Sequence, residues 1–158
     1  MKFKYTAGLA LLIILVLFYN AKSTLDGESL KVNNCSAIIN EYDSKSHIQV
    51  LFERVVTIAK SKGYARDNGF LKQGGNKWAL DRYYNFNVEW VDGDKYEVSF
   101  LSYNISPDDN IPRYISNFYF NDSVKNRKNI TSIERIDSGI WFFSGIRGAL
   151  FACKEATH

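Results

Sequence analysis

The stretch WALDRYYNFNVEWVDGDKYEVSFLSYNIS, residues 78–106, decides the fold class. From residue 84 to residue 90 apolar and polar side chains alternate, and residues 96–100 repeat the alternation. A two-residue period is typical of a strand that buries one face. Between the two runs, Asp92 and Gly93 are the residues that a tight type I′ turn requires. The stretch therefore predicts an antiparallel β-hairpin.

Two further elements are expected upstream of this hairpin. Residues 35–42 show partial alternation and predict a first strand. Residues 48–60 are ambiguous, because their apolar side chains fit both a helical stripe and one face of a strand rich in β-branched residues. Periodicity alone leaves helix and strand open for this segment.

Downstream of the hairpin, residues 106–120 contain both prolines of the chain. A short helix is expected to begin near Pro112, because the first residue of a helix does not need the backbone N–H that proline lacks. Asp109 or Asn110 is expected to cap this helix. The polar residues 121–129 predict a loop.

Three more short strands are expected at residues 130–136, 140–145 and 149–155, with a turn at 137–139. Many short strands separated by turns favour one curled antiparallel sheet. The predicted fold is therefore mainly β, with α+β as the alternative. It consists of a single-span N-terminal membrane helix and a small antiparallel β-barrel or sandwich-like domain with one short helix.

The membrane helix is predicted from the charge-free residues 5–21, which basic residues flank on both sides. Cleavage after Ala21 would place Tyr19 at the −3 position, where signal peptides carry a small residue, so we expect a retained anchor. Cleavage stays the alternative. Lys2 and Lys4 predict a cytoplasmic N-terminus. The expected organisation is a cytoplasmic tail at 1–4, a transmembrane signal anchor at 5–21, a tether at 22–34 and a periplasmic domain at 35–158.

The net charge of +3 argues against nucleic-acid binding once its position is considered. Lys2, Lys4 and Lys22 flank the membrane segment, and without them 17 basic residues face 17 acidic ones. A neutral domain binds phosphate backbones poorly. No direct nucleic-acid partner is expected.

The two cysteines lie near the two ends of the exported domain, at Cys35 and Cys153. In an oxidising compartment such a pair predicts a disulfide, and two buried free thiols remain the alternative. No metal site is expected at either cysteine.

No set of reactive side chains suggests catalysis. The sequence has two histidines and neither a G-x-S-x-G motif nor a glycine-rich phosphate loop. We expect a protein that is not an enzyme and has no cofactor. His47 is a candidate pH-sensitive residue.

The hairpin carries aromatic side chains on what the alternation predicts to be both of its faces, with Tyr83 and Tyr103 opposite Phe86 and Phe100. One face would then be covered by a partner protein or an apolar ligand. The candidate partner or ligand surface consists of Tyr84, Phe86, Trp90, Tyr96, Phe100 and Tyr103.

The chain resembles the FidL-like family of bacterial inner-membrane proteins. The resemblance rests on the early Cys35, on LDRYYNF at 80–86, on SPDDNIP at 106–112 and on IDSGIWFF with LFACK between 136 and 154. The architecture is also similar to that of MyfF, PsaF and ToxS, which are accessory partners of ToxR-like regulators.

The resemblance implies a single-pass bacterial inner-membrane protein whose periplasmic domain binds and stabilises the sensor domain of a ToxR-like transmembrane transcription regulator, as a chaperone or co-regulator in virulence. It also favours strand over helix for residues 48–60. The alternative is a periplasmic lipocalin-like module that binds a small apolar ligand, alone or shared with a partner. A weaker third hypothesis, a secreted adhesin or effector, would require cleavage of the membrane segment.

Overall fold

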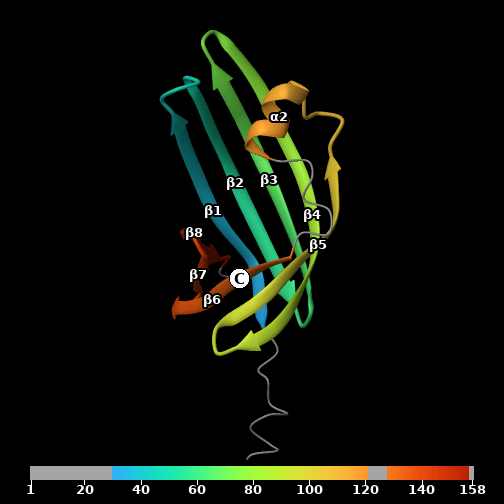
Figure 1. Ribbon diagram of the computed structural model, residues 1–158, viewed down its shortest axis with the longest axis vertical. Helices are drawn as coiled ribbons and strands as arrows, with labels where there is room; N and C mark the ends of the chain where they lie inside the picture. The colour runs from blue at the N-terminus through green and yellow to red at the C-terminus, as the bar shows by residue number, and fades with distance from the viewer. Residues whose placement is uncertain (1–29, 121–127, 157–158) are drawn as a thin grey trace, which may run out of the picture.

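The structure is a computed structural model that describes residues 30–120 and 128–156. Each strand pairs antiparallel with the next one along the chain, and β1 pairs with β8, so that the sheet closes into a barrel (Figure 1). The elements are β1 (Lys31–Asp43), β2 (Ile48–Ala59), β3 (Lys62–Gln73), β4 (Asn76–Asp92), β5 (Lys95–Ile105), α2 (Arg113–Tyr119), β6 (Lys128–Asp137), β7 (Ile140–Gly145) and β8 (Gly148–Glu155). The mainly β prediction is confirmed, as a barrel with one short helix.

The predicted anchor at 5–21 and most of the tether lie outside the described residues. Within 30–120 and 128–156, no helix is both long and apolar enough to cross a membrane. The strand β1 begins at Lys31, so the last residues of the expected tether belong to the barrel.

The barrel is closed over only part of its length. Strands β1 to β4 pair along nearly their whole length, whereas β5 pairs with β6 over Lys95–Ser99 and β1 pairs with β8 only at Cys35 and Ser36. Figure 1 shows the short strands β6, β7 and β8 at the lower half, while α2 lies against the upper half of the long strands. The lower half is therefore a closed barrel, and the upper half is an open sheet covered by a helix.

Two hydrophobic cores follow from this division. The lower core lies inside the closed barrel and includes Val32, Val56, Ile58, Phe86, Ile133 and Phe143. The upper core packs Ile111 and Ile115, from α2 and the turn before it, against side chains of β2, β3 and β4.

The segment 48–60 is a strand, as the resemblance favoured. The side chains of Ile48, Val50, Phe52, Val56 and Ile58 are all buried, which is the two-residue period of one strand face. The remaining position of that face, residue 54, is an arginine.

The central hairpin is confirmed, but its turn differs from the prediction. Asp92 pairs with Lys95, so the two turn residues are Gly93 and Asp94. Of these two, Gly93 alone has a positive φ, 54°. A type I′ turn needs a positive φ at both positions, so the type I′ prediction is wrong.

A β-bulge corrects the predicted face of Tyr103. Asn85 pairs with Ser102 and Phe86 pairs with Phe100, which leaves Leu101 as an extra residue on β5. The extra residue returns Tyr103 to the face of Tyr84, and the two rings lie 5.2 Å apart. Tyr103 therefore faces the interior, whereas Tyr83 lies on the outer face as expected, with its ring centre 6.1 Å from that of Tyr64.

The helix α2 is confirmed near Pro112, but its predicted cap is wrong. Pro112 is itself the N-cap residue, and no side chain caps the helix. The carboxylate of Asp109 instead binds Arg82, and the side-chain oxygen of Asn110 accepts the N–H of Ala79. Both side chains are used to fasten the loop to β4.

The other end of α2 is fastened to the β1–β2 turn through Asp43. This carboxylate accepts hydrogen bonds from the Ser46 hydroxyl (2.6 Å), the Lys45 N–H (2.9 Å) and the Tyr119 hydroxyl (2.9 Å). These bonds lower the pKa of Asp43 from 3.8 to about 2.

Asp43 therefore stabilises the fold above its unfolded-state pKa of about 4, and this stabilisation is lost as the pH falls towards about 2. We expect the urea midpoint of the wild type to fall across that range, and Asp43→Asn to remove part of the fall. A variant with the wild-type slope between pH 5 and pH 2.5 would contradict this assignment.

Gly69 in β3 is required by a close contact with β2. A Cβ atom at this position would lie 2.2 Å from the Leu51 carbonyl oxygen and 2.5 Å from Phe52 Cα, both of them backbone atoms. Gly69→Ala is expected to lower the free energy of unfolding by about 1–3 kcal/mol. Gly75→Ala is the matched control, because nothing lies within 4 Å of its Cβ position. Equal urea midpoints for the two variants would refute the prediction.

Candidate functional site

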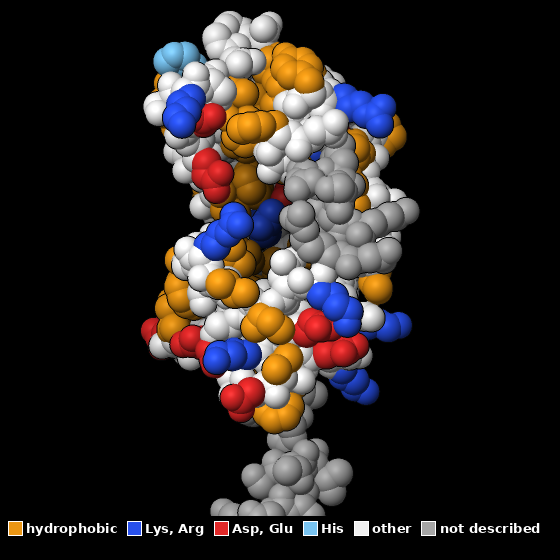
Figure 2. Space-filling view, viewed as in Figure 1, with side chains coloured by type: hydrophobic (Ala, Val, Ile, Leu, Met, Phe, Trp, Pro, Cys, Tyr) orange, Lys and Arg blue, Asp and Glu red, His pale blue; other side chains and the backbone are white. Residues whose placement is uncertain are grey.

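An open cavity of about 1040 Å³ extends from the closed half of the barrel to the end of α2. Strands from β2 to β8 supply most of its lining, which is largely apolar and includes Val56, Ile58, Phe86, Val98, Ile133 and Phe143. Tyr119 and Phe120, at the end of α2, also line it. Figure 2 shows a hollow in the middle of the molecule where basic side chains lie among hydrophobic ones. The cavity is large enough for a lipid-sized or drug-sized molecule.

Arg54 occupies an interior position of β2 and lines this cavity. Its Nε and Nη2 donate to the two carboxylate oxygens of Asp67, at 2.7 and 2.6 Å. The side chain of Asp67 is fully buried, whereas that of Arg54 is 28 % exposed. The guanidinium carbon lies 5.4 Å from the ring centres of both Phe52 and Phe151. These contacts hold the arginine head at the cavity wall.

Two opposing effects act on the pKa of Arg54. Burial alone would lower it, but the hydrogen bonds and the charge of Asp67 outweigh burial and raise it above its ordinary value. Arg54 is therefore charged at every pH at which the protein is folded.

The other charged residues of the lining are also basic. Lys128 lines the cavity and pairs with Glu97 at 2.7 Å, and the hydrogen bond and charge of Glu97 raise the pKa of Lys128. Arg147, in the β7–β8 turn, is exposed and makes no ion pair with another described residue. Among the described residues, no aspartate or glutamate lines the cavity.

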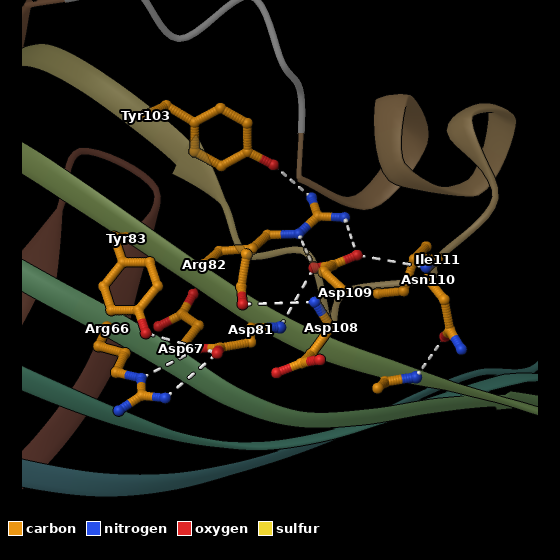
Figure 3. Close-up of polar contacts among 12 residues, drawn as sticks. Arg66, Asp67, Asp81, Arg82, Tyr83, Tyr103, Asp108, Asp109, Asn110 and Ile111 are labelled. Atoms are coloured by element: carbon orange, nitrogen blue, oxygen red, sulfur yellow. Dashed lines mark hydrogen bonds and ion pairs between the residues drawn. The ribbon is translucent and has the colours of Figure 1, made fainter.

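A second buried ion pair lies beside the cavity and fastens the helix segment to the barrel (Figure 3). Nε of Arg82 donates to Asp109 at 2.6 Å, and Nη1 donates to the Tyr103 hydroxyl at 2.5 Å. The guanidinium carbon also lies 4.4 Å from the centre of the Phe120 ring. Asp109 in turn accepts the backbone N–H groups of Asp81 and Ile111. Since the side chains of Arg82 and Asp109 are only 1 % and 2 % exposed, the pair is structural.

A family model described as "FidL-like putative membrane protein" matches residues 69–153, more than half of the chain. The chain belongs to the FidL-like family. The matched region runs from β3 to β8 and includes both partners of the Arg82–Asp109 pair, whereas β1 and β2, with Cys35 and Arg54, precede it. No curated protein matches the sequence.

The motifs that carried the resemblance meet in the FidL-like fold. Arg82 belongs to LDRYYNF and Asp109 belongs to SPDDNIP, and their ion pair joins the two segments. The prediction treated Asp109 as a candidate helix cap and gave Arg82 no role. The signal that could have revealed the role of Arg82 was an arginine on the interior face of an otherwise apolar strand.

The six residues of the candidate partner or ligand surface do not form one surface. Tyr84 and Phe86 are buried and line the cavity together with Phe100. Tyr96 and Tyr103 are partly buried and pack against the same core. Only Trp90 is exposed, at 61 %, and its Nε1 donates to the Gly93 carbonyl. Their role in binding stays a prediction.

His47 lies in the β1–β2 turn of the FidL-like chain, away from the cavity lining. It is exposed, adopts a positive φ of 55°, and its Nδ1 is 3.1 Å from the Tyr42 hydroxyl. Its pH-sensitive role stays a prediction.

The expectation that the protein is not an enzyme also stays a prediction. The described residues contain no group of three or more His, Cys, Asp or Glu that could hold a metal ion.

The predicted disulfide between Cys35 and Cys153 is confirmed. Its Cα atoms are 5.3 Å apart, and it joins β1 to β8 where the barrel closes. Both cysteines are buried. The bond therefore fastens the seam that has the fewest paired residues.

Proposed function

We propose that this FidL-like protein binds a small apolar ligand inside a periplasmic barrel that residues 5–21 anchor to the inner membrane. The cavity of about 1040 Å³ in a closed eight-stranded meander carries the proposal. Barrels of eight strands hold either packed side chains or one small ligand, and this interior leaves room for the ligand. The disulfide supports an oxidising compartment.

A photoreactive label tests this function. The full-length protein in lipid nanodiscs is irradiated with a diazirine derivative of dodecanol, and labelled peptides are identified by mass spectrometry. We expect labels on cavity residues of β4 and β5 that excess dodecanol prevents. Ala65→Phe fills the cavity and should reduce this labelling, whereas Leu101→Phe, on the exposed bulge residue, should not. Labelling only outside the cavity would refute the function.

A second function, as accessory protein of a ToxR-like regulator, is supported by an open strand edge. Residues 37–43 of β1 pair with β2 on one side, and no described strand pairs with them on the other. Ile38 and Tyr42 in this segment are 79 % and 65 % exposed. An open edge can accept an extended segment of a partner. Anchoring both proteins in one membrane would raise their effective concentration.

Co-expression with the candidate regulator tests this second function. We expect the half-life of the regulator to shorten when the FidL-like protein is deleted. Ile38→Lys, which places a charge on the open edge, should have a similar effect. Ile136→Lys, on β6, is the matched control, because Ile136 is also exposed but its strand pairs with β5 and β7 and not with β1. An unchanged half-life after deletion would count against the accessory role.

A further inference from the structure

We propose that the cavity ligand is an amphipathic anion, with its acidic head against Arg54 and its apolar body inside the closed half of the barrel. This inference rests on the ligand-binding function proposed above and specifies the chemical class of the ligand. Three features carry it: the sign of the charges around the cavity, the donors that face it, and the separation of its polar and apolar parts.

The charges that line the cavity have one sign. Arg54, Lys128 and Arg147 are its charged lining residues within the described chain, and they come from three separate elements. Asp67 pairs with Arg54 and Glu97 pairs with Lys128, but Arg147 has no acidic partner among the described residues. Among the described residues, the lining therefore carries three basic side chains and no acidic one. This arrangement attracts an anion and disfavours a cation.

Two hydrogen-bond donors at the cavity wall have no acceptor among the described residues. Arg54 uses Nε and Nη2 on Asp67, and its Nη1 makes no hydrogen bond with a described residue. Tyr84 is 8 % exposed and lines the cavity, yet its hydroxyl also makes no hydrogen bond with a described residue. Burial raises the pKa of Tyr84, so its hydroxyl stays protonated and can donate. Both donors remain accessible from the cavity, so the oxyanion of a bound ligand could accept hydrogen bonds from them.

The pairing with Asp67 fixes the direction of the arginine head. A bidentate pair and two aromatic rings hold the guanidinium in one orientation, which lowers the entropy lost when an oxyanion binds. Beyond Arg54 along β2, the interior positions are Val56 and Ile58, which line the apolar part of the cavity. A ligand with a charged head and an alkyl or ring body matches this order along the strand.

Competition with three probes of equal chain length tests the proposal. The neutral diazirine probe labels the cavity of the full-length protein in nanodiscs. In separate titrations it competes with dodecanesulfonate, dodecanol or dodecyltrimethylammonium, and the competitor concentrations in the lipid phase that halve the labelling are compared. We expect the sulfonate to displace the probe at a concentration about tenfold or more below that of dodecanol, as one charge-assisted hydrogen bond would give. The ammonium compound should be the weakest competitor.

The variant Arg54→Gln with Asp67→Asn removes the cationic head without leaving a buried carboxylate unpaired. In this variant we expect the sulfonate and dodecanol to compete within about twofold of each other. Arg54→Lys, which keeps the charge, should retain part of the preference. The wild-type comparison decides the charge preference even if the double variant does not fold.

Each other outcome has a distinct meaning. Equal competition by all three compounds in the wild type would overturn the anionic class while leaving apolar binding intact. A sulfonate preference that survives in the folded double variant would overturn the role of Arg54. Absence of cavity labelling in the wild type would overturn both the ligand-binding function and this inference.

Discussion

Cys35→Ala and Cys153→Ala are each expected to lower the free energy of unfolding by about 5 kcal/mol. The disulfide closes a loop with a sequence separation of 118 residues, and its loss restores that freedom to the unfolded chain. The folded state also depends on the bond, because only Cys35 and Ser36 of β1 pair with β8. Alanine is preferred to serine, since a serine hydroxyl at either buried position would need a new hydrogen-bond partner.

Urea unfolding of the full-length protein in detergent micelles, followed by tryptophan fluorescence, measures the effect. The two single variants and the double variant should share one midpoint, because either substitution already removes the whole bond. Wild-type protein that is reduced while unfolded and then refolded under reducing conditions should match them. Losses that add in the double variant would mean that the two cysteines act independently.

Arg82→Met is the substitution in the ion-pair network with the largest expected effect, a loss of about 3–5 kcal/mol. Methionine keeps much of the apolar stem but leaves the Asp109 carboxylate, 2 % exposed, without its countercharge. Asp109 also accepts the backbone N–H groups of Asp81 and Ile111, so its displacement would loosen the attachment of the 106–112 loop to β4. Hydrogen exchange in residues 106–119 should therefore become faster.

Arg66→Met is the matched control for this experiment. Arg66 pairs with Asp81 at 3.0 Å, but its side chain is 43 % exposed, so its loss is expected to stay within about 1 kcal/mol. Adding Asp109→Asn to Arg82→Met should recover part of the stability, because the amide oxygen still accepts a backbone N–H without a buried charge. If Arg82→Met lost no more stability than Arg66→Met, the buried pair would not hold the helix segment.

The prediction from sequence was best where the signal was local. The central hairpin, the strands near 130–136, 140–145 and 149–155, and the helix near Pro112 were all expected, because alternation and turn residues act within a few positions of each other. Residues 48–60 needed the family resemblance, since β-branched residues at mixed spacing fit both periods.

The prediction failed where one residue changed the register. The bulge at Leu101 moves Tyr103 to the interior face, and nothing in the run FLSYNI marks which residue is extra. The capping prediction failed for a related reason. Asp109 and Asn110 are ordinary cap residues, but partners brought close by the β4–β5 pairing bind them more strongly than the helix end does.

By itself, the sequence determined the strand content, the hairpin, the disulfide pair and the membership of the FidL-like family, because these depend on local period or on residue identity. Only the tertiary structure decided that Arg54 meets Asp67, that Arg82 meets Asp109, and that Arg54 lines a cavity. The partners are 13 and 27 residues apart in the chain, so their meeting depends on strand register and barrel closure. Both are properties of the whole sheet, and no single strand specifies them.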